Sequence, residues 1–312
     1  MNKVFDQKNI ILVSIDEEDL MSFLVDTDLM DDGKYDWRID ELVDEIIDVV
    51  PEYVFADYIG ANLPVTEAIS KIREAARCIY KVEEYELMRK YCMEERDASI
   101  LDVMQSKGYK SRGEFGEFLL HLLLRDFKGT IPLVSKVYFK DSANVPAHGF
   151  DAVHISPNEK ILWLGESKLY ANVKSGLVEL VKDLQKHIKS NYLDDQFIII
   201  KKNLENNTIP QRKQWIEILD ECSKMSERLN IINIPMLCVY EDDIYDKFHN
   251  VSDLQAMEYQ QKSVRELKAY FDAKTEHPLK KEMNIILFLF PVKNKGMFVR
   301  KLHERLWHMQ NL

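Results

Sequence analysis

The sequence predicts an α/β protein with a mixed sheet flanked by helices, preceded by an N-terminal α/β accessory region. Three observations lead to this prediction. From residue 111 onward, helix-like and strand-like segments alternate along the chain. A turn signal in the middle of the chain joins two apolar runs rich in β-forming residues. Acidic residues are concentrated in the first hundred positions, so the two parts of the chain differ in composition.

The chain has 312 residues, of which 46% are hydrophobic, and this length favours about two domains. We expect residues 1–105 to form the acidic accessory region, with a partner-binding or regulatory role, and residues 106–312 to hold the chemistry. No stretch approaches the roughly 18 uncharged apolar residues of a membrane span. The N-terminus turns acidic where a signal peptide has small residues, and the four cysteines are widely spaced. These features predict a cytoplasmic protein with reduced thiols.

The net charge of −11 is unevenly distributed. Residues 1–100 contain 25 acidic and 11 basic side chains, whereas residues 101–312 contain 28 and 31. Most acidic runs are solvated faces; the alternatives are a docking surface for a basic partner and a DNA mimic that covers the protein's own groove. The second part is only weakly basic, which argues against strong DNA binding by this chain alone, because affinity for duplex DNA rises with the phosphates neutralised.

The expected elements follow from the spacing of apolar residues. In the first part they are strand Asn9–Ile15 and helices Asp40–Val50, Val65–Tyr80 and Glu83–Gln105. In the second part they are helix Ser111–Phe127, strands Ile131–Lys140, His148–Ser156 and Ile161–Tyr170, helix Ser175–Ser190, strand Gln196–Lys202, helix Gln211–Leu229, strand Ile231–Tyr240, helix Ser252–Lys274, strand Asn284–Val292 and helix Met297–Met309.

The candidate site lies on the hairpin formed by the second and third strands of the second part. If the turn is centred between Asn158 and Glu159, residues whose numbers sum to 317 face each other. Asp151 is therefore expected to lie directly opposite Glu166. Opposed residues place their Cβ atoms about 4.5–5.5 Å apart, so two carboxylates there repel unless a cation lies between them. Oxygen ligands of this kind suit Mg²⁺, which keeps several waters and bridges to phosphate. We expect Mn²⁺ to substitute, and the Ser167 carbonyl to complete the coordination.

Lys168 shares a face with Glu166, since side chains on alternate strand positions point the same way. In that position it can orient an attacking water or stabilise charge that develops on a phosphate. The alternative is a structural salt bridge between Lys168 and the two acids at a sheet edge. The apolar surroundings favour the functional interpretation, because charged groups on a core-facing strand surface rarely serve packing.

The helix over Ser111–Phe127 contains two glutamates. Ser111 followed by Glu114 fits a capping box, which gives Glu114 a structural role. Glu117 lies one turn further in, among Phe and Leu, where a carboxylate needs a cation or a hydrogen-bond partner. We therefore prefer Glu117 to Glu114 as a further metal ligand.

A helix glutamate, a strand aspartate and Glu-x-Lys on the next strand, here Glu117, Asp151, Glu166 and Lys168, resemble the PD-(D/E)xK nuclease superfamily. The resemblance covers about Gly113–Ser190, with Gly149-Phe150-Asp151 where the pattern has Pro-Asp. It implies a restriction-endonuclease-like fold, Mg²⁺ and phosphodiester hydrolysis. Many members place a Gln or Lys of the following helix near the metal, so the substrate-binding candidates are Lys174 and Gln185. His148, close to Asp151, is a third candidate.

The acidic front, the GEFGE helix, GFDAVH and WLGESKLY are together similar to the nuclease subunit of the Hachiman anti-phage defence system. The resemblance implies DNA as substrate and a superfamily-2 helicase as partner. Two alternatives stay open: a non-catalytic subunit that uses a nuclease fold to regulate a helicase, and an RNA- or structure-specific nuclease. The basic C-terminal segment 293–312 is either an amphipathic helix or a phosphate-contacting edge. No feature of the sequence favours a homo-oligomer.

Overall fold

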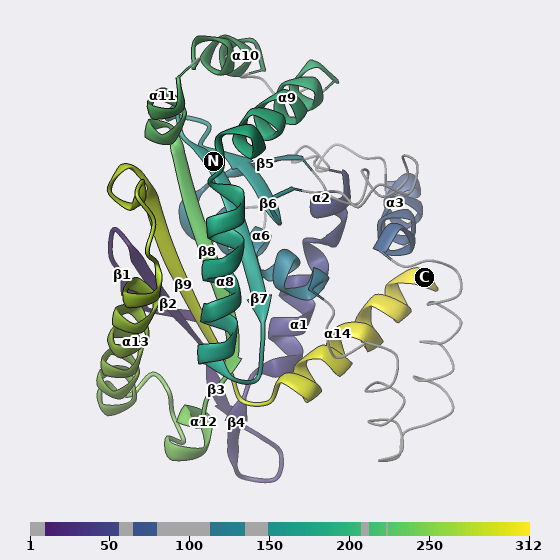
Figure 1. Cartoon of the computed structure of the whole chain (residues 1–312). Coiled ribbons are helices and arrows are strands. Elements are labelled where there is room, and N and C mark those ends of the chain that lie inside the picture. Colours follow the sequence, from purple (N-terminus) through teal and green to yellow (C-terminus); the bar gives the residue numbers. More distant parts are fainter. Residues whose placement is uncertain (1–9, 56–64, 80–112, 135–148, 207–211, 223) are drawn as a thin grey trace.

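A computed structural model describes residues 10–55, 65–79, 113–134, 149–206, 212–222 and 224–312. Its centre is a curled sheet in which parallel and antiparallel neighbours are mixed (Figure 1). The strands, in spatial order, are β1 (Ile11–Asp16), β2 (Leu20–Val25), β9 (Asn284–Val292), β8 (Ile232–Glu241), β7 (Leu162–Leu169), β6 (Ala152–Ile155) and β5 (Ile131–Val134). The four strands from β2 to β7 in this order run parallel to one another, and the outer pairs are antiparallel. The predicted mixed sheet is confirmed.

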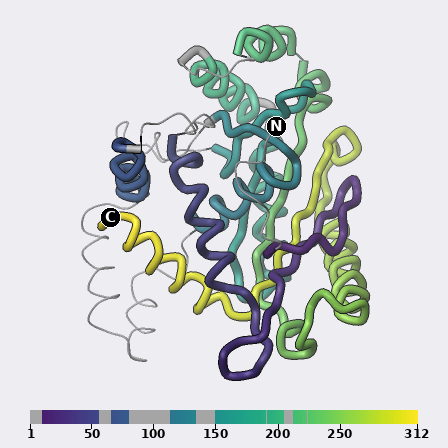
Figure 2. Tube along the Cα trace, turned by 180° about the vertical axis from the view of Figure 1, so that it is seen from behind, coloured from purple at the N-terminus to yellow at the C-terminus, as the bar shows by residue number. Residues whose placement is uncertain are grey.

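Helices cover both faces of the sheet, and each face has its own hydrophobic core. Figure 1 looks onto the face covered by α8, and α1 and α14 lie in front in the reverse view of Figure 2. The α8 face carries α8 (Val173–His187), α9 (Ser190–Asn206), α10 (Arg212–Glu221), α11 (Met225–Asn230) and α13 (Leu254–Lys274). The other face carries α1 (Ile39–Asp48), α2 (Val50–Phe55), α3 (Val65–Ile79), α6 (Glu114–Lys128) and α14 (Lys295–Gln310). Smaller elements are β3 (Thr27–Leu29), β4 (Tyr35–Trp37), α12 (Ile244–Lys247) and the 3₁₀ turn η3 (Lys280–Glu282).

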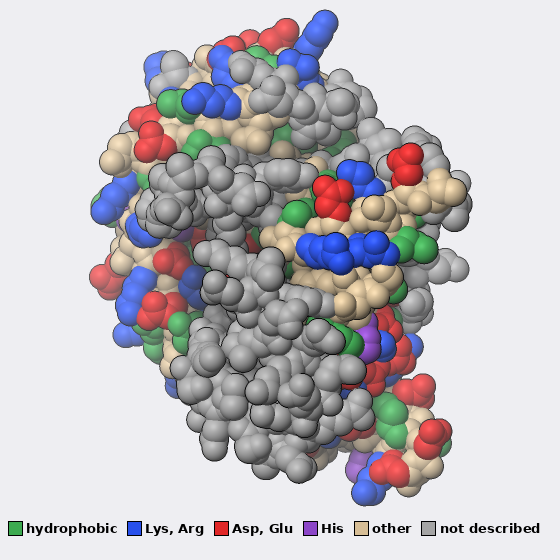
Figure 3. Space-filling view, turned by 90° about the vertical axis from the view of Figure 1, so that its right-hand side faces the viewer, with side chains coloured by type: hydrophobic (Ala, Val, Ile, Leu, Met, Phe, Trp, Pro, Cys, Tyr) green, Lys and Arg blue, Asp and Glu red, His purple; other side chains and the backbone are tan. Residues whose placement is uncertain are grey.

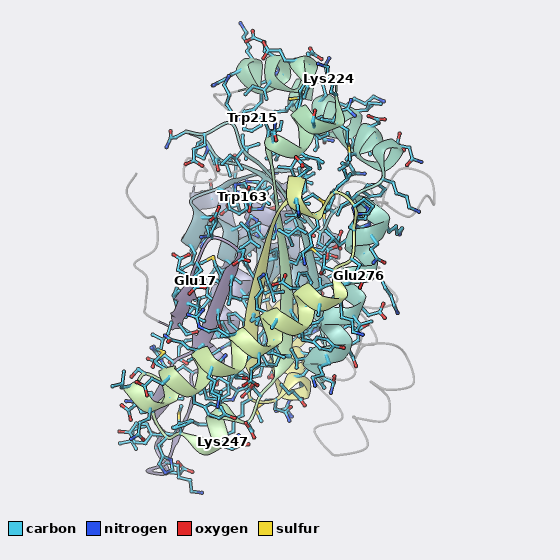
Figure 4. The ribbon with its side chains drawn as sticks, turned by 60° about the vertical axis from the view of Figure 1, so that its left-hand side comes forward. Glu17, Trp163, Trp215, Lys224, Lys247 and Glu276 are labelled. Carbon is cyan, nitrogen blue, oxygen red and sulfur yellow. The ribbon has the colours of Figure 1, made fainter. Side chains whose placement is uncertain are left out.

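The first part of the chain shares the sheet of the second part. β2 pairs in parallel with β9, so the N-terminal hairpin β1–β2 extends the sheet at the edge away from the candidate site. Figure 4 shows α13 crossing this region. Arg265 of α13 makes a bidentate ion pair with Glu17, with N–O distances of 2.8 and 3.1 Å. The domain boundary expected near residue 105, and the helix expected over residues 83–105, lie outside the described residues.

The predicted strand over residues 196–202 is wrong, because this segment lies inside α9. The buried residues Leu193, Phe197, Ile200 and Leu204 are spaced by four and three positions, which is one face of a helix, while Ile198 is 54% exposed. A short apolar run cannot by itself distinguish a buried strand from a buried helix. Most other predicted elements are present with ends shifted by a few residues, but β2 was not predicted.

The start of α6 also differs from expectation. The helix begins at Glu114 after Gly113, so Glu114 is its first residue and not the third position of a capping box. Ser111 lies outside the described residues.

The charged C-terminal segment pairs with acidic residues of the N-terminal region. Lys301 lies 2.6 Å from Asp40 and Arg305 lies 2.8 Å from Asp44, so α14 is fastened to α1 by two parallel ion pairs. Figure 3 shows the side of the molecule that carries α3 and α14, where described side chains of both charge signs are interspersed. These contacts favour the interpretation of residues 293–312 as an amphipathic helix, with part of the acidic front balanced within the chain. No helix among the described residues is long and apolar enough to cross a bilayer.

Gly165 is required by the close packing of α6 and β8 against β7. A methyl group at this position would lie 2.8 Å from a side-chain carbon of Leu120 and 3.0 Å from one of Pro235. We expect Gly165→Ala to lower the free energy of unfolding by about 1–3 kcal/mol, the usual cost of overpacking a core. Chemical denaturation measures this change, and Gly113→Ala is the control because its added methyl meets no atom within 4 Å. Equal stability of the two variants would contradict the packing described here.

Candidate functional site

The site is built on β7, whose residues alternate between the two cores. Leu162 and Leu164 belong to the core under α8, whereas Trp163 and Leu169 belong to the core under α6. Glu166 and Lys168 continue the first series, so both are directed toward α8, as predicted. Glu166 is 3% exposed, and Lys168 keeps 22% of its side chain exposed. The β7 strand therefore brings a carboxylate and an ammonium group to one face, next to solvent.

The predicted register of the hairpin is confirmed over four residue pairs, from Ile155 opposite Leu162 to Ala152 opposite Gly165. Regular pairing ends there, because the Asp151 amide donates to the Gly165 carbonyl at 2.8 Å. The Asp151 carboxylate then turns toward Ser167, whose amide and hydroxyl donate to its Oδ2 at 2.8 and 3.0 Å. The prediction that Asp151 lies directly opposite Glu166 is therefore corrected. The pairing becomes irregular at the end of β6, and this places the Asp151 carboxylate beside the β7 backbone at Ser167.

Lys168 is nevertheless electrostatically linked to both acids. Burial by itself would lower its pKa, but the hydrogen bond to Asp183 of α8 and the charges of Asp151 and Glu166 outweigh burial and raise the pKa above its usual value. Lys168 is therefore a cation at neutral pH. A lysine held in this form is suited to neutralise a phosphate oxygen, and it is unsuited to accept a proton from water.

Glu117 has a partner that sequence reasoning missed. The phenol of Tyr53, on α2, donates to Glu117 Oε2, and Tyr53 is only 6% exposed against the ring of Phe118. Burial raises the Tyr53 pKa well above its usual value, and the charges of Glu117 and Asp151 raise it further. Asp151 therefore acts electrostatically on both Tyr53 and Lys168, which links the α6 side of the site to the α8 side. The sequence signal for Tyr53 is weak, because it lies more than sixty positions from its partner.

The remaining predicted site residues lie in different surroundings. Lys174 is exposed in the first turn of α8, with its ammonium group 5.5 Å from the ring centre of Tyr270. Gln185 is exposed on the same helix. Ser167 is buried and donates to Asp151. That its carbonyl oxygen binds the metal ion stays a prediction. His148 lies outside the described residues. Two residues of α8 that were not predicted, Asp183 and His187, contact the charged residues of β7.

His187 lies against the site glutamate. Its Nδ1 is 2.8 Å from Glu166 Oε1, and the imidazole is 6% exposed. A sequence signal existed, because His187 falls on the buried face of α8 with Leu177, Leu180 and Leu184. A polar residue on an apolar helix stripe needs a partner in the core, and here the partner is Glu166.

A second polar network lies under α2, next to Tyr53. His121 Nδ1 lies 3.0 Å from His154 Nε2, and His154 Nδ1 lies 2.8 Å from the hydroxyl of Thr130. Glu52 contacts the other nitrogen of His121 at 3.5 Å and pairs with Arg125 at 3.2 Å. Burial lowers the pKa of His154 to about 3 and lowers that of His121 well below its usual value. Both rings are therefore neutral at physiological pH.

The donor chemistry of the site fits a hard divalent cation. Asp151 and Glu166 offer carboxylate oxygens, and Mg²⁺ is commonly held by one or two carboxylates with water and substrate phosphates as its other ligands. Within the described part of the chain, no three His, Cys, Asp or Glu side chains are already gathered as a metal-binding group. A two-carboxylate site that is completed by water and phosphate is compatible with this arrangement.

The fold and the site together define a mixed α/β protein with carboxylates grouped around one half-buried lysine, where regular pairing between two adjacent strands of its sheet ends. A comparison with curated proteins gives no match. The chain belongs to the HamA family, whose model matches residues 2–306. HamA is a component of the Hachiman anti-phage defence system.

Proposed function

We propose that the chain is the nuclease subunit of a Hachiman system and hydrolyses phosphodiester bonds in DNA with Mg²⁺. The observation that carries the proposal is Lys168, held as a cation beside Asp151 and Glu166 on a strand that is otherwise buried. A purely structural ion pair here is a weak source of stability, because Lys168 and Asp183 keep 22% and 29% of their side chains exposed to solvent. Charged residues retained in such a place favour a role in chemistry.

In the proposed reaction, a water oxygen forms a bond to phosphorus while the bond to one bridging oxygen breaks. The attacking water loses a proton to solvent, and the departing oxygen takes one from solvent, so the protons balance. Lys168 keeps its own proton, so it binds a non-bridging phosphate oxygen and orients the water. Asp151 and Glu166 would hold the metal ion, with Glu117 as a further ligand once Tyr53 no longer bonds to it. When bound, the ion supplies Lewis-acid polarisation of the phosphate and lowers the pKa of a coordinated water.

A helicase subunit is the proposed partner. The part of the chain after residue 100 has a formal charge of only +3, from 31 basic and 28 acidic residues. Because duplex affinity depends on the number of phosphates neutralised, this chain needs another subunit to bring it onto DNA. Membership of a defence system with a partner component is consistent with such a division of labour.

Two observations favour a second candidate, a non-catalytic subunit that regulates a helicase. Glu117 is already bonded to Tyr53, and the described residues contain no ready-made group of three metal ligands. In that case the carboxylates would serve as structural partners of Lys168 and His187, and metal removal would change nothing that the complex does.

Metal dependence tests the proposal. End-labelled single-stranded and duplex DNA and RNA are incubated with the chain, alone and with the helicase subunit of the same system, in Mg²⁺ or Mn²⁺. We expect cleavage of DNA that EDTA abolishes and that added Mg²⁺ restores. Cleavage of RNA alone would identify the alternative substrate. Absence of cleavage with every substrate, metal and partner would support the regulatory subunit instead.

A further inference from the structure

Two residues one turn apart on α8 contact the two charged residues of β7. Asp183 pairs with Lys168, and His187 Nδ1 lies 2.8 Å from Glu166 Oε1. The order is reversed along the two elements, since the residue later in α8 contacts the residue earlier in β7. α8 therefore runs antiparallel to β7 over the site.

The spacings of the two elements match. Four residues of α-helix rise about 6 Å, and two residues of β-strand rise about 6.6 Å. Asp183 and His187 are therefore separated along α8 by nearly the distance that separates Lys168 and Glu166 along β7. One rigid helix can hold both charged groups at once without distorting either element.

His187 is itself held in place by aromatic rings. Tyr192 stacks on the imidazole with ring centres 4.4 Å apart and planes tilted by 11°, and Phe150 meets it edge-on at 5.0 Å. Phe150 immediately precedes Asp151 in the chain. The ring that contacts Glu166 is thus fixed by residues from α9 and from the segment that carries the other site carboxylate.

We propose that Asp183 and His187 are positioning residues, which hold Lys168 and Glu166 in the orientation that the reaction needs. This inference rests on the proposed function. The buried polar pair Glu166–His187 is a weak source of stability, because an apolar pair of similar volume often stabilises a core as well. We therefore attribute the pair to the geometry that it fixes. Groups that orient a metal-binding carboxylate typically contribute about 10–100-fold to activity or metal affinity.

The test compares substitutions that keep or remove the contacting atom. His187→Leu removes the imidazole nitrogen, whereas His187→Asn keeps a side-chain nitrogen near the position of Nδ1. Asp183→Leu and Asp183→Asn form the corresponding pair for Lys168. Glu179→Gln is the matched control, since Glu179 lies on the same helix, is partly exposed and pairs with Lys182. For each variant, kcat and KM for labelled DNA, Mn²⁺ affinity without DNA, and Tm are measured.

We expect both leucine variants to lower kcat about 10–100-fold with KM changed less than about 3-fold, and His187→Leu to weaken Mn²⁺ binding similarly. His187→Asn is expected to recover most of this loss, and Glu179→Gln to match the wild type. A folded His187→Leu variant with wild-type kcat and Mn²⁺ affinity would overturn the positioning role while leaving the nuclease proposal intact. All cleavage assays include the helicase subunit of the same system, and failure of the wild type to cleave DNA in its presence with Mg²⁺ or Mn²⁺ would overturn the nuclease proposal.

Discussion

Replacing Lys168 with methionine is expected to reduce DNA cleavage by at least about 100-fold while the protein stays folded. Lys168 is the cation at the centre of Asp151, Glu166 and Asp183, and its raised pKa keeps it charged throughout the neutral range. Removing one hydrogen-bond donor that stabilises developing charge typically costs about 10²–10³ in kcat. Methionine retains the length and apolar stem of the side chain, so the loss reports on the charge. Single-turnover cleavage of labelled DNA gives the rate.

Lys182→Met is the matched control for this experiment. Lys182 lies on α8, its side chain is 62% exposed, and it pairs with Glu179. The Lys182→Met substitution removes the same charge from the same helix without changing β7. Its cleavage rate is therefore expected to stay within about 2-fold of the wild-type rate, since exposed ion pairs contribute little. Near-wild-type cleavage by Lys168→Met would remove the basis of the proposed reaction.

Acidification is expected to unfold the protein well before its carboxylates are fully protonated. The folded state keeps His154 neutral with a pKa of about 3, whereas an unfolded histidine has a pKa near 6.5. Between these values the unfolded chain binds more protons, so stability falls as pH falls below about 6.5. One such histidine lowers the free energy of unfolding by about 1.4 kcal/mol per pH unit, or roughly 3 kcal/mol by pH 4.5. His121 lowers it in the same direction.

Burial explains why neither ring accepts a proton. His121 and His154 are 1% and 2% exposed, so a charged imidazolium at either position would lose its hydration. The neutral rings are joined by a hydrogen bond between His121 Nδ1 and His154 Nε2, and the Thr130 hydroxyl contacts His154 Nδ1. Urea denaturation at several pH values measures the slope. His154→Leu is expected to flatten it, and His308→Asn, an exposed substitution on α14, to leave it unchanged. Equal slopes for the wild type and His154→Leu would contradict this account.

The hairpin was predictable because its signals are local. The turn over Pro157–Lys160 fixes the register of β6 and β7, and strand alternation then places Glu166 and Lys168 on one face. The position of Asp151 was not predictable to the same degree. It lies where regular pairing stops, and a slip of one residue redirects a side chain.

Other features depend on tertiary contacts that a single sequence does not reveal. Tyr53 reaches Glu117 only because α2 packs on α6, and His187 reaches Glu166 only because α8 lies antiparallel over β7. Residues 196–202 of α9 were predicted as a strand because a short continuous apolar run fits both the helix period and the strand period. β2 lacks the polar alternation of a half-exposed strand, since all six of its residues are buried.

The position of β9 in the sheet has a consequence for how the protein is made. β2 has no neighbour on its inner edge until Asn284–Val292 pairs with it, although β2 itself is synthesised within the first twenty-five residues. A two-stranded hairpin alone is marginal in water, so the growing polypeptide cannot complete its central layer before Asn284–Val292 has been synthesised. Ribosome-bound fragments that stop before β9 are therefore expected to lack a finished sheet.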